Sequence, residues 1–231
     1  MSFTLTPEEV VALRLSLEIA ARSVLWSLPF AIFVAWLLTR TRFVGRTLFD
    51  AFVHLPLVLP PVATGYVLLL LFGNRGPLGR LFHEHLGIEF AFTKAGAALA
   101  TAVMTFPLMV RTIRIALEGV DRGLEAAART LGAGPFDRFA TITLPLMAPG
   151  ILAGAVTAFS AALGEFGAVI TFVSNIPGET RTLPLALYTA IQSPNGDAMA
   201  LRLAIMAFVL GLGGLLLAEF LARRVRWRLG R

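Results

Sequence analysis

Apolar residues gather into five long segments, which lie near residues 16–38, 52–72, 95–115, 149–171 and 201–221. Each segment is close to the about 20 residues that an α-helix needs to cross a bilayer. The segments lack the alternation of apolar and polar positions that strands show, and a helix in lipid satisfies its own backbone hydrogen bonds. The pattern therefore predicts an all-α integral membrane protein with five transmembrane helices, in a single domain of residues 1–231.

Composition supports lipid as the solvent of this chain. Hydrophobic residues make up 57% and charged residues only 15%, and the mean hydropathy is +0.78, whereas about a quarter of the residues of a typical soluble domain are charged. The absence of cysteine excludes disulfides and thiolate catalysis. We expect no catalytic residue, no metal site and no cofactor in this chain. Its one lysine, Lys94, lies in no glycine-rich phosphate-binding loop, so we also expect no ATPase of its own.

Positive charge is unevenly distributed between the segments. The net charge is +6, and most arginines lie after the first, third and fifth segments or, for Arg111 and Arg114, at the end of the third segment: Arg40, Arg42, Arg46, Arg111, Arg114, Arg122, Arg129, Arg138, Arg223, Arg224, Arg226, Arg228 and Arg231. Because cytoplasmic loops carry the excess of Lys and Arg, we expect the N-terminus outside and the C-terminus in the cytoplasm of a prokaryotic plasma (inner) membrane. This placement explains the basic balance without nucleic acid.

The connection of residues 119–146 is unusually structured for a loop. Asp121 is a helix cap, and the helix that follows should end near Leu131 before the turn Gly132-Ala133-Gly134. Pro135 should start a second short helix to about Thr141. By contrast, we expect the outer connections, residues 73–93 and 174–198, to hold one short amphipathic helix and a loop with turns, respectively.

This connection resembles the EAA loop of ABC importer permeases. Nine residues separate its glycine from Ile-x-Leu-Pro, as in that motif, while its glutamate stands one residue earlier than the motif places it. The resemblance implies a coupling helix that docks on a separate ATPase subunit. The residues concerned are Glu125, Ala126, Ala127, Ala128, Gly132, Ala133, Gly134, Pro135, Ile142, Leu144 and Pro145.

Four further stretches are similar to the permeases of molybdate importers, namely residues 54–61, 105–111, 163–168 and 172–182. The resemblance implies a channel-forming subunit for molybdate or tungstate that forms a homodimer in the lipid membrane. It also implies two ATP-binding cassette subunits, which bind the ATP and Mg, and a periplasmic or extracellular oxyanion-binding protein as partners. Two alternatives remain: the same architecture importing sulfate or thiosulfate, and a secondary transporter driven by an ion gradient. Five spans do not divide into the repeats typical of the latter.

Prolines and glycines mark a candidate translocation path. Pro56, Pro60 and Pro61 should kink or break the second segment, because proline lacks the backbone donor, although a kink used only for packing would have the same pattern. Glu165 is an acid within the fourth segment, for which we favour a structural or gating role over substrate contact. The path and gate candidates are Pro60, Pro61, Thr64, Ser160, Gly164, Glu165, Phe166 and Gly167.

Overall fold

The computed structural model describes residues 5–228, and this part of the chain is helical without strands. The end of the arginine-rich tail, including Arg231, lies outside the described residues. The elements are α1 Pro7–Arg40, α2 Arg46–His54, η1 Leu55–Leu57, α3 Pro61–Phe72, α4 Pro77–Leu86, α5 Lys94–Glu118, α6 Arg122–Thr130, α7 Pro135–Arg138, η2 Phe139–Thr143, α8 Leu144–Leu163, α9 Gly167–Val173, α10 Leu183–Gln192 and α11 Asp197–Arg228.

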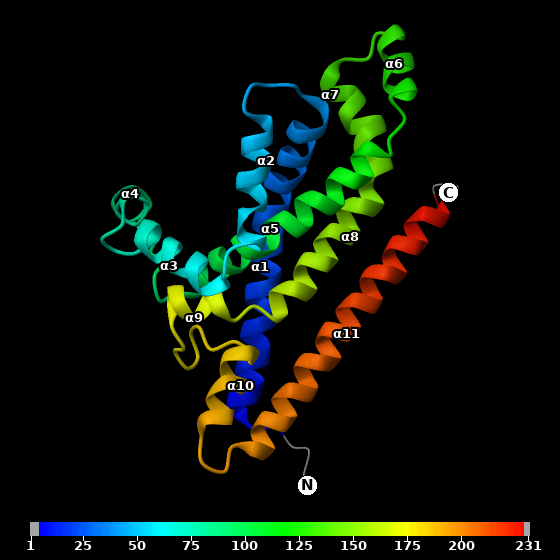
Figure 1. Ribbon diagram of the computed structural model, residues 1–231. Coiled ribbons are helices and arrows are strands. Elements are labelled where there is room, and N and C mark those ends of the chain that lie inside the picture. The colour runs from blue at the N-terminus through cyan, green and yellow to red at the C-terminus, as the bar shows by residue number, and fades with distance from the viewer. Residues whose placement is uncertain (1–4, 229–231) are drawn as a thin grey trace.

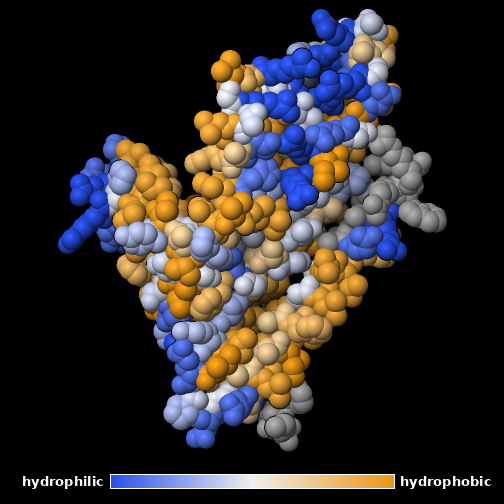
Figure 2. Space-filling view, in the orientation of Figure 1, coloured by the Kyte–Doolittle hydropathy of each residue, from blue (hydrophilic) through white to orange (hydrophobic). Residues whose placement is uncertain are grey.

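Three long helices, α1, α5 and α8, form the centre of the molecule and contact one another, while α11 lies along α8 (Figure 1). Small buried residues such as Ala31, Ala35 and Ala158 let these helices approach closely. The outer face of α11 is apolar and exposed, with Phe208 and Leu216 among its side chains. Figure 2 shows hydrophobic residues over α11 and the middle of the molecule, and hydrophilic residues at the end that holds α6 and α7. This distribution fits a membrane-embedded body.

The second apolar segment is not one crossing helix. Arg46–Leu57 and Pro61–Phe72 meet at an angle of 111°, so the expected break at the prolines is confirmed, and the bent pair begins at Arg46, before the expected start at residue 52. Pro60 caps α3 and Pro61 opens it. The described residues hold four helices long and apolar enough to cross a membrane, or up to five if this bent pair counts as one span.

The fourth segment also differs from the sequence-based expectation of residues 149–171. Its helix begins much earlier, since α7, η2 and α8 run on as one long apolar helix over Pro135–Leu163. The second short helix expected after Pro135 is therefore the start of this span, and η2 within it is a π-helix. The span ends at Leu163, and the separate short helix α9 follows.

The outer connections contain more helix than expected. The amphipathic helix predicted in residues 73–93 is confirmed as α4, where Phe82 packs against Phe72 and Phe90. Residues 174–198 were expected to form a loop, but they include the helix α10, which packs on α1 and α11. A buried ion pair, Glu9 Oε1 to Arg202 Nε at 2.8 Å, ties α1 to α11 at the same end of the molecule.

Candidate functional site

The connection of residues 119–146, called the elbow here, projects from the bundle as a helix, a turn and a second helix (Figure 1). Asp121 caps α6 by accepting a hydrogen bond from the Gly123 N–H at 2.8 Å, and α6 ends at Thr130, as expected. Gly132 adopts a φ of +86°, a left-handed conformation that side chains disfavour. Gly134 then caps α7, which Pro135 opens. The glycine turn thus sets the angle between α6 and the span that follows.

The tip of the elbow exposes large apolar side chains. Leu131 is 88% exposed and Phe136 is 82% exposed, and Leu124 is also exposed. Ala126 and Ala127 are exposed beside them on α6, whereas Ala128 is half-buried. Exposed apolar groups with small neighbours are typical of a helix that enters a groove on a protein partner.

Glu125 joins the elbow to the bundle. Its Oε1 accepts a hydrogen bond from Arg40 Nη2 at 3.0 Å and another from Thr143 Oγ1 at 2.7 Å. Arg40 ends α1 and Thr143 ends η2, so one carboxylate connects three elements. Sequence reasoning placed Glu125 in the loop but missed Arg40, because 85 positions separate the two residues and no local pattern joins them.

The other motif residues form the junction between the elbow and the fourth span. Ile142 lies half-buried on η2, Leu144 begins α8, and Pro145 lies exposed at the second position of α8. The π-helix at this junction is notable because such bulges occur often at functional sites.

A second cluster of candidates lies where α3 meets α9. A methyl group added to Gly65 would lie 2.6 Å from the Ala168 carbonyl oxygen, and one added to Gly167 would lie 2.7 Å from Pro61 Cβ. Thr64 is buried in this contact zone, and its Oγ1 has no hydrogen-bond partner among residues 5–228. The two short helices therefore touch backbone to backbone, with Pro60 at the break that precedes α3.

Glu165 and Phe166 lie in the break between α8 and α9. Glu165 Oε1 accepts a hydrogen bond from the Ala168 N–H at 3.0 Å, so the side chain caps the first turn of α9. Phe166 packs against Tyr188 of α10, with ring centroids 5.1 Å apart. This geometry assigns Glu165 a contact within its own chain that organises the short helix.

Two path candidates lie apart from this contact. Ser160 donates a hydrogen bond to the Val156 carbonyl and faces α11, where a methyl group on Gly214 would collide with its hydroxyl. Gly164 follows the end of α8 and is exposed. The structure therefore brings together Pro61, Thr64 and Gly167, but it places Ser160 at a different helix contact.

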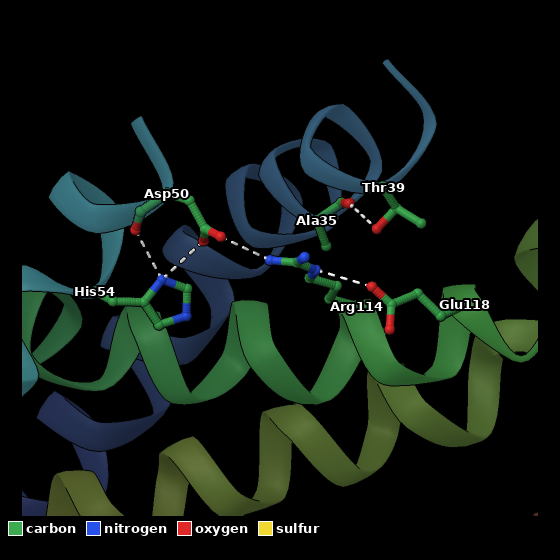
Figure 3. A network of polar contacts seen from close by, with 6 residues as sticks. All are labelled: Ala35, Thr39, Asp50, His54, Arg114 and Glu118. Atoms are coloured by element: carbon green, nitrogen blue, oxygen red, sulfur yellow. Dashed lines mark hydrogen bonds and ion pairs between the residues drawn. The ribbon is translucent and has the colours of Figure 1, made fainter. Parts of the chain in front are cut away.

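A polar network that sequence reasoning did not anticipate joins α2 to α5 (Figure 3). Arg114 Nη1 lies 2.9 Å from Asp50 Oδ2, and Arg114 Nε lies 3.0 Å from Glu118 Oε1. His54 Nδ1 lies 2.9 Å from the Asp50 carbonyl oxygen and 3.1 Å from its Oδ1. Because α5 leads directly into the elbow, Arg114 links the elbow to the half of the second span that precedes the break. In residues 5–228, no three His, Asp or Glu side chains gather in a way that could hold a metal ion.

Comparison with known proteins defines the class of this fold. The chain superposes on the crystal structure of a bacterial ABC transporter involved in the import of the acidic polysaccharide alginate, with a TM-score of 0.74 and 17% identity over 95% of this chain and 80% of that one. At this identity the likeness concerns the fold alone, which is that of an ABC transporter membrane subunit.

Residues 27–227 match the family described as the binding-protein-dependent transport system inner membrane component, and the chain belongs to this family. It is 59% identical to the molybdenum transport system permease protein ModB of Escherichia coli K12, over 98% of this chain and 99% of that protein. It is 53% identical to the protein of the same name from Haemophilus influenzae, over 96% and 97% of the two chains. The chain is thus a multi-pass membrane permease rather than an enzyme.

Proposed function

We propose that this chain forms half of the channel of an ATP-driven importer that carries molybdate, or the similar oxyanion tungstate, into the cell. The observation that carries the proposal is the likeness to molybdenum permeases over almost the full length of both chains. The elbow supports the proposal that ATP drives the import, because its exposed Leu131 and Phe136 are available to an ATPase subunit at the membrane surface.

The partners follow from the geometry and the family. One chain has one elbow, so an importer with two ATPase subunits needs a second copy of this chain, and a twofold pair is the commonest arrangement. ATP and Mg bind to the ATPase subunits, and this chain needs no cofactor. An external binding protein delivers the oxyanion to the side opposite the elbow. The arginine-rich segments favour an elbow and C-terminus in the cytoplasm and an N-terminus outside.

Two routes carry motion from the elbow into the membrane. The first runs through Glu125 to Arg40 of α1 and Thr143 of η2, so a tilt of α6 moves the ends of two central helices. The second runs through Arg114 to Asp50 of α2. Hydrogen-bonded and packed elements of this kind couple distant sites when both sites bias the same two conformations.

The contact between α3 and α9 serves as the gate in this proposal. Both helices follow breaks, and irregular backbone at membrane depth is tolerated where it is buried in protein or lines a cavity. Neither Pro61 nor Gly167 supplies a charge, so an oxyanion meets backbone and hydroxyl groups such as Thr64 here. Glu165 keeps α9 ordered and does not contact the cargo.

The cargo is tested by reconstituting the permease with its ATPase and binding-protein partners in liposomes. Molybdate and tungstate should stimulate ATP hydrolysis at concentrations at which sulfate and thiosulfate do not. Stimulation by sulfate alone would overturn the assignment of the cargo and leave the importer architecture standing. Transport that needs an ion gradient and no ATP would overturn the architecture as well.

Docking of the elbow is tested with Gly132→Asp. The substitution forces a side chain into a left-handed turn and adds a charge beside Leu131, so ATPase subunits should no longer co-purify, while membrane insertion persists. Gly87→Asp is the matched control, since Gly87 also has a positive φ, +63°, with open space around it, but lies at the end of α4. Normal co-purification with Gly132→Asp would contradict docking through the elbow.

A further inference from the structure

A cavity of about 320 Å³ lies between the elbow and the end of α1. Helices α1, α6, α7 and η2 each contribute to its wall. Its lining residues are Trp36, Arg40, Arg122, Glu125, Pro135, Arg138, Phe139 and Thr143.

The cavity carries an excess of positive charge. Three guanidinium groups line it, and the single carboxylate, Glu125, is engaged by Arg40. Arg122 and Arg138 form no ion pair among residues 5–228. The Arg40 side chain is only 11% exposed, and its buried Nε has no hydrogen-bond acceptor in the same part of the chain. A small anion in the cavity would balance part of this charge.

The position of the cavity matches the level of lipid headgroups. Arg40 ends the long apolar helix α1, and Trp36 lies one turn before it. Tryptophan is enriched at membrane–water interfaces, and basic pockets between transmembrane helices bind lipid headgroups. Trp36 and Phe139 give the cavity an apolar side, which suits a group that is charged at one end.

The surface suited to a protein partner lies elsewhere on the elbow. Leu131 and Phe136 are its most exposed large apolar side chains, and neither lines the cavity. A protein groove would cover those side chains, whereas the cavity offers two guanidinium groups without ion pairs in the described part of the chain, in a small space. The charge and size therefore favour a phosphate group over a protein side chain.

We propose that this cavity binds a phosphate group, supplied by the headgroup of an anionic membrane lipid or by free phosphate. The planar guanidinium forks of Arg122 and Arg138 match phosphate oxygens in a bidentate manner. Arg122 lies at the start of α6 and Arg138 at the end of α7, so the bound phosphate bridges both arms of the elbow and holds their angle. Transmission of force through the elbow then depends on this ligand, whichever oxyanion the channel carries.

The test compares Arg122→Gln/Arg138→Gln with the wild type, both purified as the complete complex. Native mass spectrometry measures phosphatidylglycerol retained per chain from nanodiscs of phosphatidylcholine with phosphatidylglycerol. A second arm measures radiolabelled inorganic phosphate bound in nanodiscs of phosphatidylcholine alone. Arg129→Gln is the matched control, because Arg129 is exposed on α6 outside the cavity. Arg122→Lys/Arg138→Lys keeps the charge but loses the fork.

Loss of two bidentate contacts should lower retention by about tenfold or more in the glutamine variant, less in the lysine variant, and not at all in the control. Loss confined to phosphatidylglycerol identifies a lipid as the source, and loss confined to inorganic phosphate identifies a free ion; both support the site. Equal retention of both ligands by the wild type and the glutamine variant overturns it. The glutamine variant could also retain both ligands as the wild type does but lose the ATPase subunits. That result would overturn the phosphate site and would show that the cavity receives an acidic side chain of the ATPase.

Discussion

At the scale of single residues, Glu125 matters through both its position and its charge. Its carboxylate lies between the end of α1 and the end of η2, and among residues 5–228 it is the only acid lining the cavity beside the elbow. The Arg40 side chain is nearly buried, so it depends on Glu125 to compensate its positive charge. Removing one member of such a pair leaves an uncompensated charge, which costs more than the pair itself contributes.

Glu125→Ala should therefore destabilise the elbow by about 1–3 kcal/mol, because Arg40 and Thr143 lose their shared acceptor. The expected result is a lower thermal unfolding midpoint of the purified complex and weaker stimulation of ATP hydrolysis by cargo, with the ATPase subunits still bound. Thr143→Val, which removes one hydrogen bond, should have a smaller effect in the same direction.

The control for this variant is Glu18→Ala. Glu18 pairs with Arg22 at 2.7 Å, but Arg22 is 49% exposed, and such surface pairs contribute about 0–1 kcal/mol. If Glu125→Ala and Glu18→Ala lost the same fraction of cargo-stimulated ATP hydrolysis, Glu125 would have no specific role in coupling.

At the scale of elements, the contact between α2 and α5 depends on Arg114. This residue lies 2.9 Å from Asp50 across the two helices, and both side chains are about a quarter to a third exposed (Figure 3). Asp50→Asn and Arg114→Gln should each weaken cargo-stimulated ATP hydrolysis, since each removes the ion pair that joins α2 to α5, while the pair of Arg114 with Glu118 lies within α5 alone.

A double-mutant cycle separates this link from local effects on each helix. The double variant should lose less than the sum of the single variants, with a coupling energy of about 0.5–3 kcal/mol for thermal stability. Additive losses would show that Asp50 and Arg114 act independently and that no force passes between α2 and α5 through them.

A second prediction at this scale concerns the contact between α3 and α9. Gly65→Ala places a methyl group 2.6 Å from the Ala168 carbonyl, so the helices must separate at a cost of about 1–3 kcal/mol. Cargo uptake into liposomes should fall strongly while ATPase subunits still co-purify. Gly211→Ala, which meets nothing within 4 Å on α11, should transport normally. Normal uptake with Gly65→Ala would exclude this contact as the gate.

Sequence patterns captured the helices whose signals are local and missed those set by distant contacts. The break before Pro61 was predictable because proline lacks a backbone donor. The end of α8 at Leu163 was not predicted, since apolar residues resume after it and continue through Phe172. Gly164 and Glu165 interrupt the run, Glu165 caps α9, and Gly167 packs closely on Pro61. Arg40, a partner of Glu125, and Asp50, a partner of Arg114, lie 85 and 64 positions away, beyond any local pattern.

At the scale of the whole molecule, the charge distribution and the shape indicate the same orientation of the chain in the membrane. Figure 2 shows hydrophilic residues gathered around α6 and α7, beyond the apolar middle, and the arginines of the first and third connections lie at that end. The bond between Arg40 and Glu125 brings these two connections together. Arginine-rich connections lie preferentially in the cytoplasm, so one orientation, with this end of the molecule in the cytoplasm, suits both of them.

The chain contains no cysteine, so Ala133→Cys creates one thiol without background. Ala133 lies in the turn of the elbow and is partly exposed, so a membrane-impermeant maleimide should label it in inside-out vesicles and leave it unlabelled in intact spheroplasts. Asn195→Cys, which lies exposed in the turn before α11, should show the opposite pattern. Labelling of Ala133→Cys from the outside would place the elbow where no ATPase can reach it. That result would leave the membrane fold intact but would overturn every coupling route drawn from α6.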